Sequence, residues 1–166
     1  ETQEIKDAGN YTLTASNGTT NIEKKVTVSP AEISITSATV QGKTYDGNTT
    51  ATVESVEFTG LQNDESLTSG TDYTATAAFN SANAGSQTAT VTVTLADTVK
   101  NYTLASDGKT TTATAAIHPL PVVLNWGTIS FTYDGSEKTV TATVTNRVGE
   151  DVITLSYEGN TGTAVN

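Results

Sequence analysis

The chain has 166 residues and a formal net charge of −10, with only 8 Lys and Arg residues against 18 Asp and Glu residues. A nucleic-acid partner and an anionic membrane surface are disfavoured, because binding to phosphate requires clustered basic side chains. The chain has no Cys, which excludes a disulfide framework and a thiolate metal site.

The composition favours β-structure over helix. Thr is the most abundant residue, hydrophobic residues make up 35% of the chain, and charged residues make up 16%. Thr is β-branched, which suits extended strands. No apolar run is long enough to cross a membrane, so we expect no membrane insertion within these residues. The length indicates one or two small domains with thin cores.

Alternation of apolar and polar residues predicts strands along the whole chain. The clearest example is residues 89–95, which read Ala-Thr-Val-Thr-Val-Thr-Leu and place apolar side chains on one face only. Turn-forming pairs such as Asp-Gly and Asn-Gly separate the alternating stretches. We therefore expect an all-β fold with essentially no helix. In chain order the other predicted strands are at residues 11–15, 26–28, 33–35, 113–117, 122–124, 139–144 and 153–157.

Three short features recur in the same order at a spacing of roughly 90 residues, the size of a small β-sandwich domain. A repeat of this size predicts tandem modules. The recurring features are Asn-Tyr-Thr-Leu at 10–13 and 101–104, Pro at 30 and 119, and Thr-Tyr-Asp-Gly at 44–47 and 132–135.

The two prolines mark the predicted module boundaries, because Pro fixes φ and cannot donate to a sheet. Residues 31–118 form one complete module by this division. Residues 1–29 are the C-terminal strands of a preceding repeat, and residues 120–166 are the N-terminal part of a following one. The chain begins and ends within the pattern, so sorting signals are expected outside it. We expect residues 1–29 to complete the 120–166 segment, within one chain or between neighbouring molecules, because exposed sheet edges favour pairing.

The ordered motifs of the central part resemble the bacterial YDG repeat. Residues 63–65, Asn-Asp-Glu, depart from the usual Gly-Asp of that pattern. The last segment is similar to the related MBG-type surface repeat. The YDG-like motifs lie at residues 43–51, 60–67, 82–85 and 101–104, and the MBG-like motifs at 133–135, 149–151 and 157–160.

The resemblance implies tandem Ig-like antiparallel β-sandwich modules in long bacterial cell-surface proteins, and it implies no catalytic residues and no cofactor. The Asp-Gly pair of each Thr-Tyr-Asp-Gly motif is expected to form a turn, with Gly at positive φ. The preceding Tyr is expected to cap the sandwich core and to bond the corner through its hydroxyl. The predicted corner residues are Tyr45, Asp46, Gly47, Tyr133, Asp134 and Gly135.

Catalytic and metal-binding chemistry is poorly represented in the sequence. The only His, His118, has no neighbouring Ser or Asp motif and cannot form a zinc site alone. The carboxylate pairs at 64–65 and 150–151 could support glycoside hydrolysis or Ca²⁺ binding, although solvated turns are the favoured interpretation. An isopeptide cross-link would need a Lys (24, 25 or 43) beside an acceptor such as Asn101.

The sequence thus predicts a non-catalytic structural or stalk module of a repetitive bacterial surface protein or adhesin, wall-anchored or secreted, whose partners are neighbouring modules of the same chain. The alternative is a carbohydrate- or host-matrix-binding module that uses Trp126 and Tyr157 to stack on a glycan or contact a matrix protein. Trp126 is expected to be buried in the small sandwich core, which favours the stalk, whereas an exposed Trp126 flanked by Tyr in a groove favours the binding module.

Overall fold

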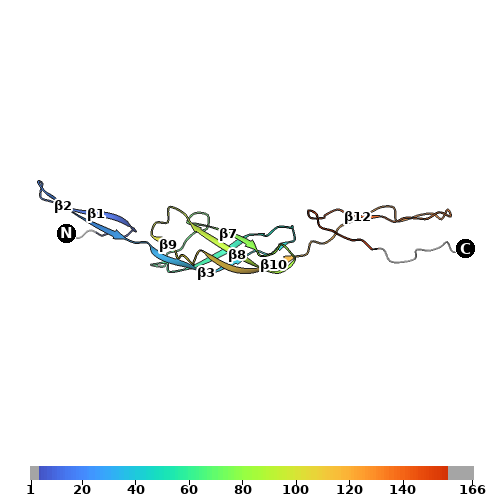
Figure 1. Ribbon diagram of the computed structural model, residues 1–166, viewed down its shortest axis with the longest axis horizontal. Coiled ribbons are helices and arrows are strands. Elements are labelled where there is room, and N and C mark those ends of the chain that lie inside the picture. Colours follow the sequence, from blue (N-terminus) through green and yellow to red (C-terminus); the bar gives the residue numbers. More distant parts are fainter. Residues whose placement is uncertain (1–3, 157–166) are drawn as a thin grey trace.

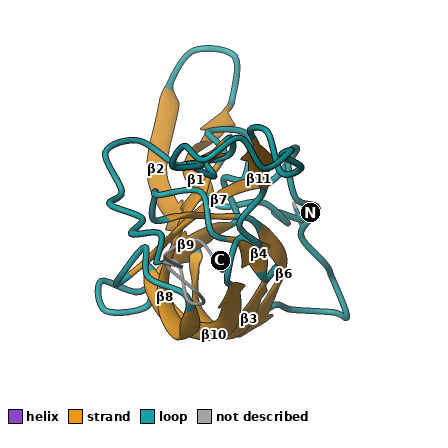
Figure 2. Ribbon diagram, turned by 90° about the vertical axis from the view of Figure 1, so that its right-hand side faces the viewer, coloured by secondary structure: helices purple, strands orange, loops and turns teal. Residues whose placement is uncertain are grey.

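The computed structural model describes residues 4–156, and every regular element in that range is a strand (Figures 1 and 2). The predicted all-β fold without helix is therefore confirmed for these residues. The strands are β1 (Gly9–Ser16), β2 (Asn21–Val28), β3 (Ala31–Val40), β4 (Lys43–Thr44), β5 (Thr50–Ala51), β6 (Val53–Thr59), β7 (Tyr73–Phe79), β8 (Gly85–Leu95), β9 (Tyr102–Leu104), β10 (Thr110–His118), β11 (Leu124–Trp126) and β12 (Ala142–Val144).

Two sheets enclose the main core, which lies between Ala31 and His118. One sheet has the strand order β4-β10-β8-β7-β5, and the other has the order β6-β3-β9. β10 is hydrogen-bonded to β8 within its own sheet and packs against β3 of the other sheet (Figure 2). Buried side chains from both sheets form one hydrophobic cluster, so the central part of the chain is a two-layer β-structure.

The alternating sequence of β8 explains its place at the centre of the larger sheet. Ala89, Val91 and Val93 are at most 2% exposed, whereas the Thr residues between them face solvent. Their burial removes apolar surface from water, while the β-branched Thr residues suit the solvated face of the pleat. The alternation thus fixes which face of β8 meets the core.

The predicted purely antiparallel pairing is wrong in two places. β10 pairs parallel with β4, and β3 pairs parallel with β9. In each pair the later strand returns to the early part of the module after long intervening segments, which parallel pairing requires. Alternation indicates which face of a strand is buried, but it carries no information about the direction of its neighbour.

Two smaller sheets flank the central module. β1 and β2 form an antiparallel hairpin before it, and β11 and β12 form a short antiparallel pair after it. These two sheets lie at opposite ends of an elongated molecule (Figure 1). In this conformation residues 4–29 therefore do not complete the C-terminal segment of their own chain, and completion between neighbouring molecules stays a prediction.

The C-terminal segment contains less regular structure than its alternation predicts. β11 and β12 have three residues each, and residues 153–156 carry no strand. Large apolar side chains remain exposed here, including Val152 and Ile129. A stable strand needs both a paired neighbour and a covering layer. β11 and β12 pair with each other, but no second sheet covers them among residues 120–156. Among residues 4–156, no helix is long and apolar enough to cross a membrane.

Candidate functional site

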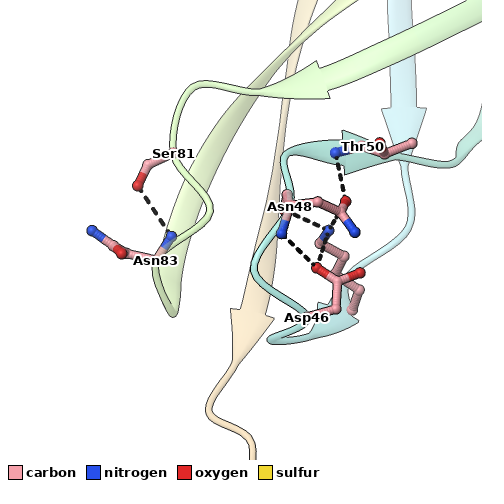
Figure 3. Close-up of polar contacts among 6 residues, drawn as sticks. Asp46, Asn48, Thr50, Ser81 and Asn83 are labelled. Carbon is pink, nitrogen blue, oxygen red and sulfur yellow. Dashed lines mark hydrogen bonds and ion pairs between the residues drawn. The ribbon is translucent and has the colours of Figure 1, made fainter. Parts of the chain in front are cut away.

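The first Thr-Tyr-Asp-Gly motif forms a hydrogen-bonded corner directly after β4 (Figure 3). The Asp46 carboxylate accepts a hydrogen bond from the Asn48 amide at 3.1 Å, and Asn48 Oδ1 accepts one from the Thr50 amide at 2.9 Å. Gly47 has a φ of +78°, which favours glycine. Lys43 Nζ donates to Asp46 Oδ1 at 2.7 Å and to Asn48 Oδ1 at 2.9 Å. The corner is thus a turn held by its own side chains.

The second Thr-Tyr-Asp-Gly motif has the same local geometry. Asp134 Oδ1 accepts a hydrogen bond from the Ser136 amide at 2.9 Å, and Gly135 has a φ of +79°. Lys138 forms an ion pair with Asp134, as Lys43 does with Asp46. Both copies therefore form an Asx-turn beside a lysine, although the two lysines lie on opposite sides of the motif in sequence.

The lysines lower the pKa of both corner carboxylates. The hydrogen bond from Lys43 is the main cause at Asp46, with a further contribution from the Asn48 amide. At Asp134, hydrogen bonds from Lys138 and Ser136 lower the pKa to about 2. Each cause favours the charged form of the carboxyl group. Neither corner therefore holds a carboxyl group suited to donate a proton near neutral pH.

Tyr45 joins its corner to the C-terminal segment. Its hydroxyl donates to Asp151 Oδ1 at 3.0 Å, and its amide donates to the His118 carbonyl oxygen at 2.8 Å. The hydrogen bond to Asp151 raises the pKa of Tyr45, with smaller contributions from partial burial and nearby negative charge. Tyr45, Val148 and Asp151 line an open hollow of about 160 Å³ at this junction. The ring therefore lies between the central module and the segment that follows it.

Tyr133 differs from Tyr45 despite the shared turn. It is 77% exposed, so the expectation that its ring caps a sandwich core is wrong for this copy. The physical reason is that residues 120–156 form only the β11–β12 sheet and no second layer of strands for the ring to cover. The turn around Asp134 forms from local hydrogen bonds alone, which explains why it survives without a core.

The other repeated motif lies at the opposite junction. The Asn101 side chain accepts a hydrogen bond from the Ala8 amide at 2.7 Å and donates one to Asp7 Oδ1 at 3.0 Å. Tyr102 is 8% exposed, its hydroxyl donates to Glu65, and it accepts from the Gln62 amide. The hydrogen bond to Glu65 raises the pKa of Tyr102.

One member of each carboxylate pair accepts a hydrogen bond from a tyrosine, although Glu65 is exposed in its turn, as the solvated-turn interpretation expects. Glu65 bonds to Tyr102, whereas Asp151 bonds to Tyr45 at the other end of the central module. Asp64 has a φ of +58° within its turn. Between residues 4 and 156, no group of three His, Asp or Glu side chains could hold a metal ion.

The remaining candidate residues are not brought together. His118 is exposed, and its carbonyl oxygen bonds to the Tyr45 amide. Lys43 contacts the corner carboxylate, whereas Asn101 contacts the N-terminal segment, so the structure separates these two candidates for an isopeptide bond. Trp126 is 55% exposed at the end of β11, so the favoured expectation that it is buried is wrong. Tyr157 lies outside the described residues.

The junction partners Asp7 and Asp151 were not predicted from the sequence. Each lies in a flanking segment far along the chain from the motif that it bonds. The available signal in the sequence is that each motif carries a polar side-chain group, the Asn101 amide or the Tyr45 hydroxyl. The sequence does not indicate which residue forms a hydrogen bond with either group. Residues 81–83 form a local contact instead, because the Asn83 backbone amide donates a hydrogen bond to the Ser81 hydroxyl oxygen within one turn (Figure 3).

Comparison with known proteins identifies the central part of the chain. The family model of the YDG domain matches residues 29–113, about half of the chain. This range contains β3 to β9 and the first residues of β10, including the corner at residues 43–50. The comparisons with curated proteins and with solved structures gave no match. The chain therefore belongs to the YDG domain family.

Proposed function

We propose that this chain is a non-catalytic spacer of a repetitive bacterial cell-surface protein or adhesin, wall-anchored or secreted. Its Ig-like β-sandwich modules would stand in tandem and hold a distal domain away from the cell. The observation that carries the proposal is that both repeated motifs contact flanking segments at the module ends, Tyr45 at one end and Asn101 at the other. Motifs used in this way fix the direction in which one module follows another.

Further support comes from the chemistry of the two junctions. The Tyr45–Asp151 contact and the Asn101–Asp7 contact are hydrogen bonds to side chains with fixed geometry. Pro30 and Pro119 restrict the backbone where the central module begins and ends. Both features limit bending between modules, which suits a spacer better than a flexible tether.

A second candidate is a carbohydrate- or host-matrix-binding module. The observation that favours it is the exposed indole of Trp126, since exposed aromatic rings can stack on sugars. Trp126 does not line the hollow at the Tyr45 junction. The spacer is therefore the function that the geometry supports better.

The spacer proposal can be tested by surface display. The chain is inserted between a bacterial wall anchor and an epitope tag, and a Gly/Ser linker of 166 residues serves as the matched control. We expect the tag to bind antibody through a polysaccharide layer with the chain and poorly with the linker, because a coiled linker spans less distance than a stiff array. Equal antibody binding in both strains contradicts the proposal.

The binding alternative requires a separate test. Glycan arrays and matrix-protein binding are measured with the wild-type chain and with Trp126→Ala. Saturable binding that the substitution removes would establish the second candidate. Under the spacer proposal, neither protein binds above background.

A further inference from the structure

The β1–β2 hairpin has one apolar face that no second sheet covers among residues 4–156. Cross-strand partners share a face, and the pairs Tyr11↔Val26 and Ala15↔Ile22 lie on the same side as Leu13. Leu13 is 54% exposed and Ile22 is 71% exposed. Lys24, opposite Leu13, is the one charged residue on this face, and its methylene stem can cover apolar neighbours. The opposite face carries only Asn, Thr, Ser, Glu and Lys.

The register of this hairpin matches that of β8 and β10 in the central module. The hairpin ladder runs through eight pairs, from Gly9↔Val28 to Ser16↔Asn21. The β8–β10 ladder also has eight pairs, from Gly85↔Ile117 to Thr92↔Thr110. In both ladders the first glycine follows Ala, and the residue paired with that glycine lies two positions before a Pro. β1 is therefore the counterpart of β8, and β2 is the counterpart of β10, so the two Asn-Tyr-Thr-Leu copies do not occupy equivalent positions.

This correspondence shows what the apolar face would meet in a complete module. Leu13 takes the position of Ala89, which is fully buried, and Val28 takes that of Ile117, which is 1% exposed. The side chains of the central module reach this burial because β3 and β6 of the opposite sheet cover them. The hairpin thus has the strands of a sandwich centre without its cover.

The C-terminal segment has the complementary deficiency. The pair Trp126↔Ala142 takes the position of Ala38↔Val56, because Trp126 lies seven residues before Tyr133 as Ala38 lies seven residues before Tyr45. β11 and β12 are therefore the counterparts of β3 and β6. Ala38 packs against the core, whereas the large apolar side chains of this segment are exposed: Val122, Val123, Trp126, Ile129, Phe131, Tyr133, Val140, Val152 and Ile153.

We propose that the β1–β2 hairpin of one copy of this chain completes the C-terminal segment of a second copy. In the central module, β10 pairs parallel with β4 through Ile117↔Lys43 and His118↔Thr44. The same register between copies pairs Val28 with Phe131 and Ser29 with Thr132. The Tyr133 amide then donates to the Ser29 carbonyl oxygen, as the Tyr45 amide donates to that of His118.

The geometry allows this pairing between copies and gives it a direction. The hairpin and the C-terminal segment lie at opposite ends of the molecule (Figure 1). The contact is therefore heterologous, and repeated contacts give open chains of copies rather than closed dimers. Each contact rebuilds a module between two central modules, so the polymer continues the same array. This proposal rests on register and exposure and does not depend on the proposed spacer role.

Solution mass provides the first test. Light scattering coupled to size exclusion is measured over a wide range of concentration for the wild-type chain, for Leu13→Asp and for Thr12→Asp, which adds the same charge to the opposite face of β1. We expect the wild-type mass to rise from 17.2 kDa to at least twice that value. Leu13→Asp should weaken association at least about tenfold, because it removes an apolar side chain from the interface and adds a carboxylate there, and burying that charge costs free energy even with Lys24 opposite it. Thr12→Asp should associate as the wild type does.

Two results overturn the proposal: a wild-type chain that stays monomeric at every concentration, and association that Leu13→Asp leaves unchanged. Cross-linking then tests the register, and the absence of native Cys makes it specific. Copies with Val28→Cys are mixed with copies with Phe131→Cys under mild oxidation. A mixed disulfide is expected, because directly paired strand residues lie within disulfide reach. Thr27→Cys is the control, and an equal yield from this control contradicts the register.

Discussion

Two tyrosine hydroxyls at the ends of the central module each donate a hydrogen bond to a carboxylate. Tyr45 donates to Asp151, and Tyr102 donates to Glu65. In both cases the hydroxyl belongs to a repeated motif, whereas the carboxylate belongs to a neighbouring loop or segment. The motif therefore provides a fixed donor, and its effect on the junction depends on where an acceptor lies. Tyr133 occupies the equivalent donor position in the second motif, but its side chain is exposed.

The Tyr45 contact predicts an unusual ionisation. Because the hydrogen bond to Asp151 favours the neutral phenol, Tyr45 should titrate above the ordinary value of 10.0. A pKa raised by folding means that this contact stabilises the junction below pH 10 and is lost as the pH rises through the folded value. Carbon-13 NMR of labelled tyrosine measures the titration. Asp151→Ala should return Tyr45 to its ordinary range, whereas Glu150→Ala should not. An unshifted wild-type Tyr45 contradicts the contact.

The Asp46 corner predicts the opposite dependence on pH. Lys43 and the Asn48 amide lower the pKa of Asp46 below its ordinary 3.8, so the turn is stabilised above that pH and loses this contribution as the pH falls through the folded value. The Asn48 amide shift reports the change by NMR. Lys43→Gln should move the Asp46 titration to higher pH. Lys138→Gln is the matched control, since it acts on Asp134, and it should leave Asp46 unchanged.

At the level of elements, the central module is stabilised by the buried face of β8. Val91 is fully buried, whereas its neighbour Thr90 faces solvent. Val91→Ala should lower the free energy of unfolding by about 2 kcal/mol, from lost apolar burial and the cavity that remains. Thr90→Ala should change it by less than about 0.5 kcal/mol. Urea unfolding monitored by circular dichroism gives both values. Equal effects of the two substitutions would contradict the observed orientation of β8.

Alternation predicted β3, β8 and β10 of the central module because each has one buried face, although the predicted strands were shorter than the observed ones. The strands β4 to β7 and β9 were not among the predicted elements. Alternation did not predict strand partners. The Asn-Tyr-Thr-Leu stretch at 10–13 lies in β1, which pairs antiparallel with β2, whereas the copy at 101–104 leads into β9, which pairs parallel with β3. The same letters therefore occupy different sheet positions. Pairing depends on contacts distant in sequence, and no local pattern encodes them.

The candidate site was predictable to a similar extent. The turn at Asp46-Gly47 follows from residue chemistry, since Gly accepts positive φ and Asp bonds to the amide two residues on. The burial of Tyr133 and Trp126 was predicted wrongly. Both expectations assumed a covering sheet, and the C-terminal segment of a single copy does not have one.

At the scale of the whole molecule, the chain consists of one two-layer module with a smaller sheet at each end (Figure 1). Its contacts at the two junctions involve different residues, so the two ends of the central module are distinct. The proposed spacer role depends on whether these junctions hold the flanking segments in place. If they do, the distance between the hairpin and the C-terminal segment is long and narrowly distributed.

Electron-spin distance measurement tests this claim most directly. Lys25 and Glu137 are exposed at the two ends, and a chain without native Cys can be spin-labelled at Lys25→Cys and Glu137→Cys alone. Labelled chains are diluted with an excess of unlabelled chains, so that only distances within one copy are recorded. We expect one long and narrow distance distribution that broadens when Tyr45→Phe removes the junction hydrogen bond. A broad distribution that extends to short distances in the wild-type chain would contradict the proposed spacer role.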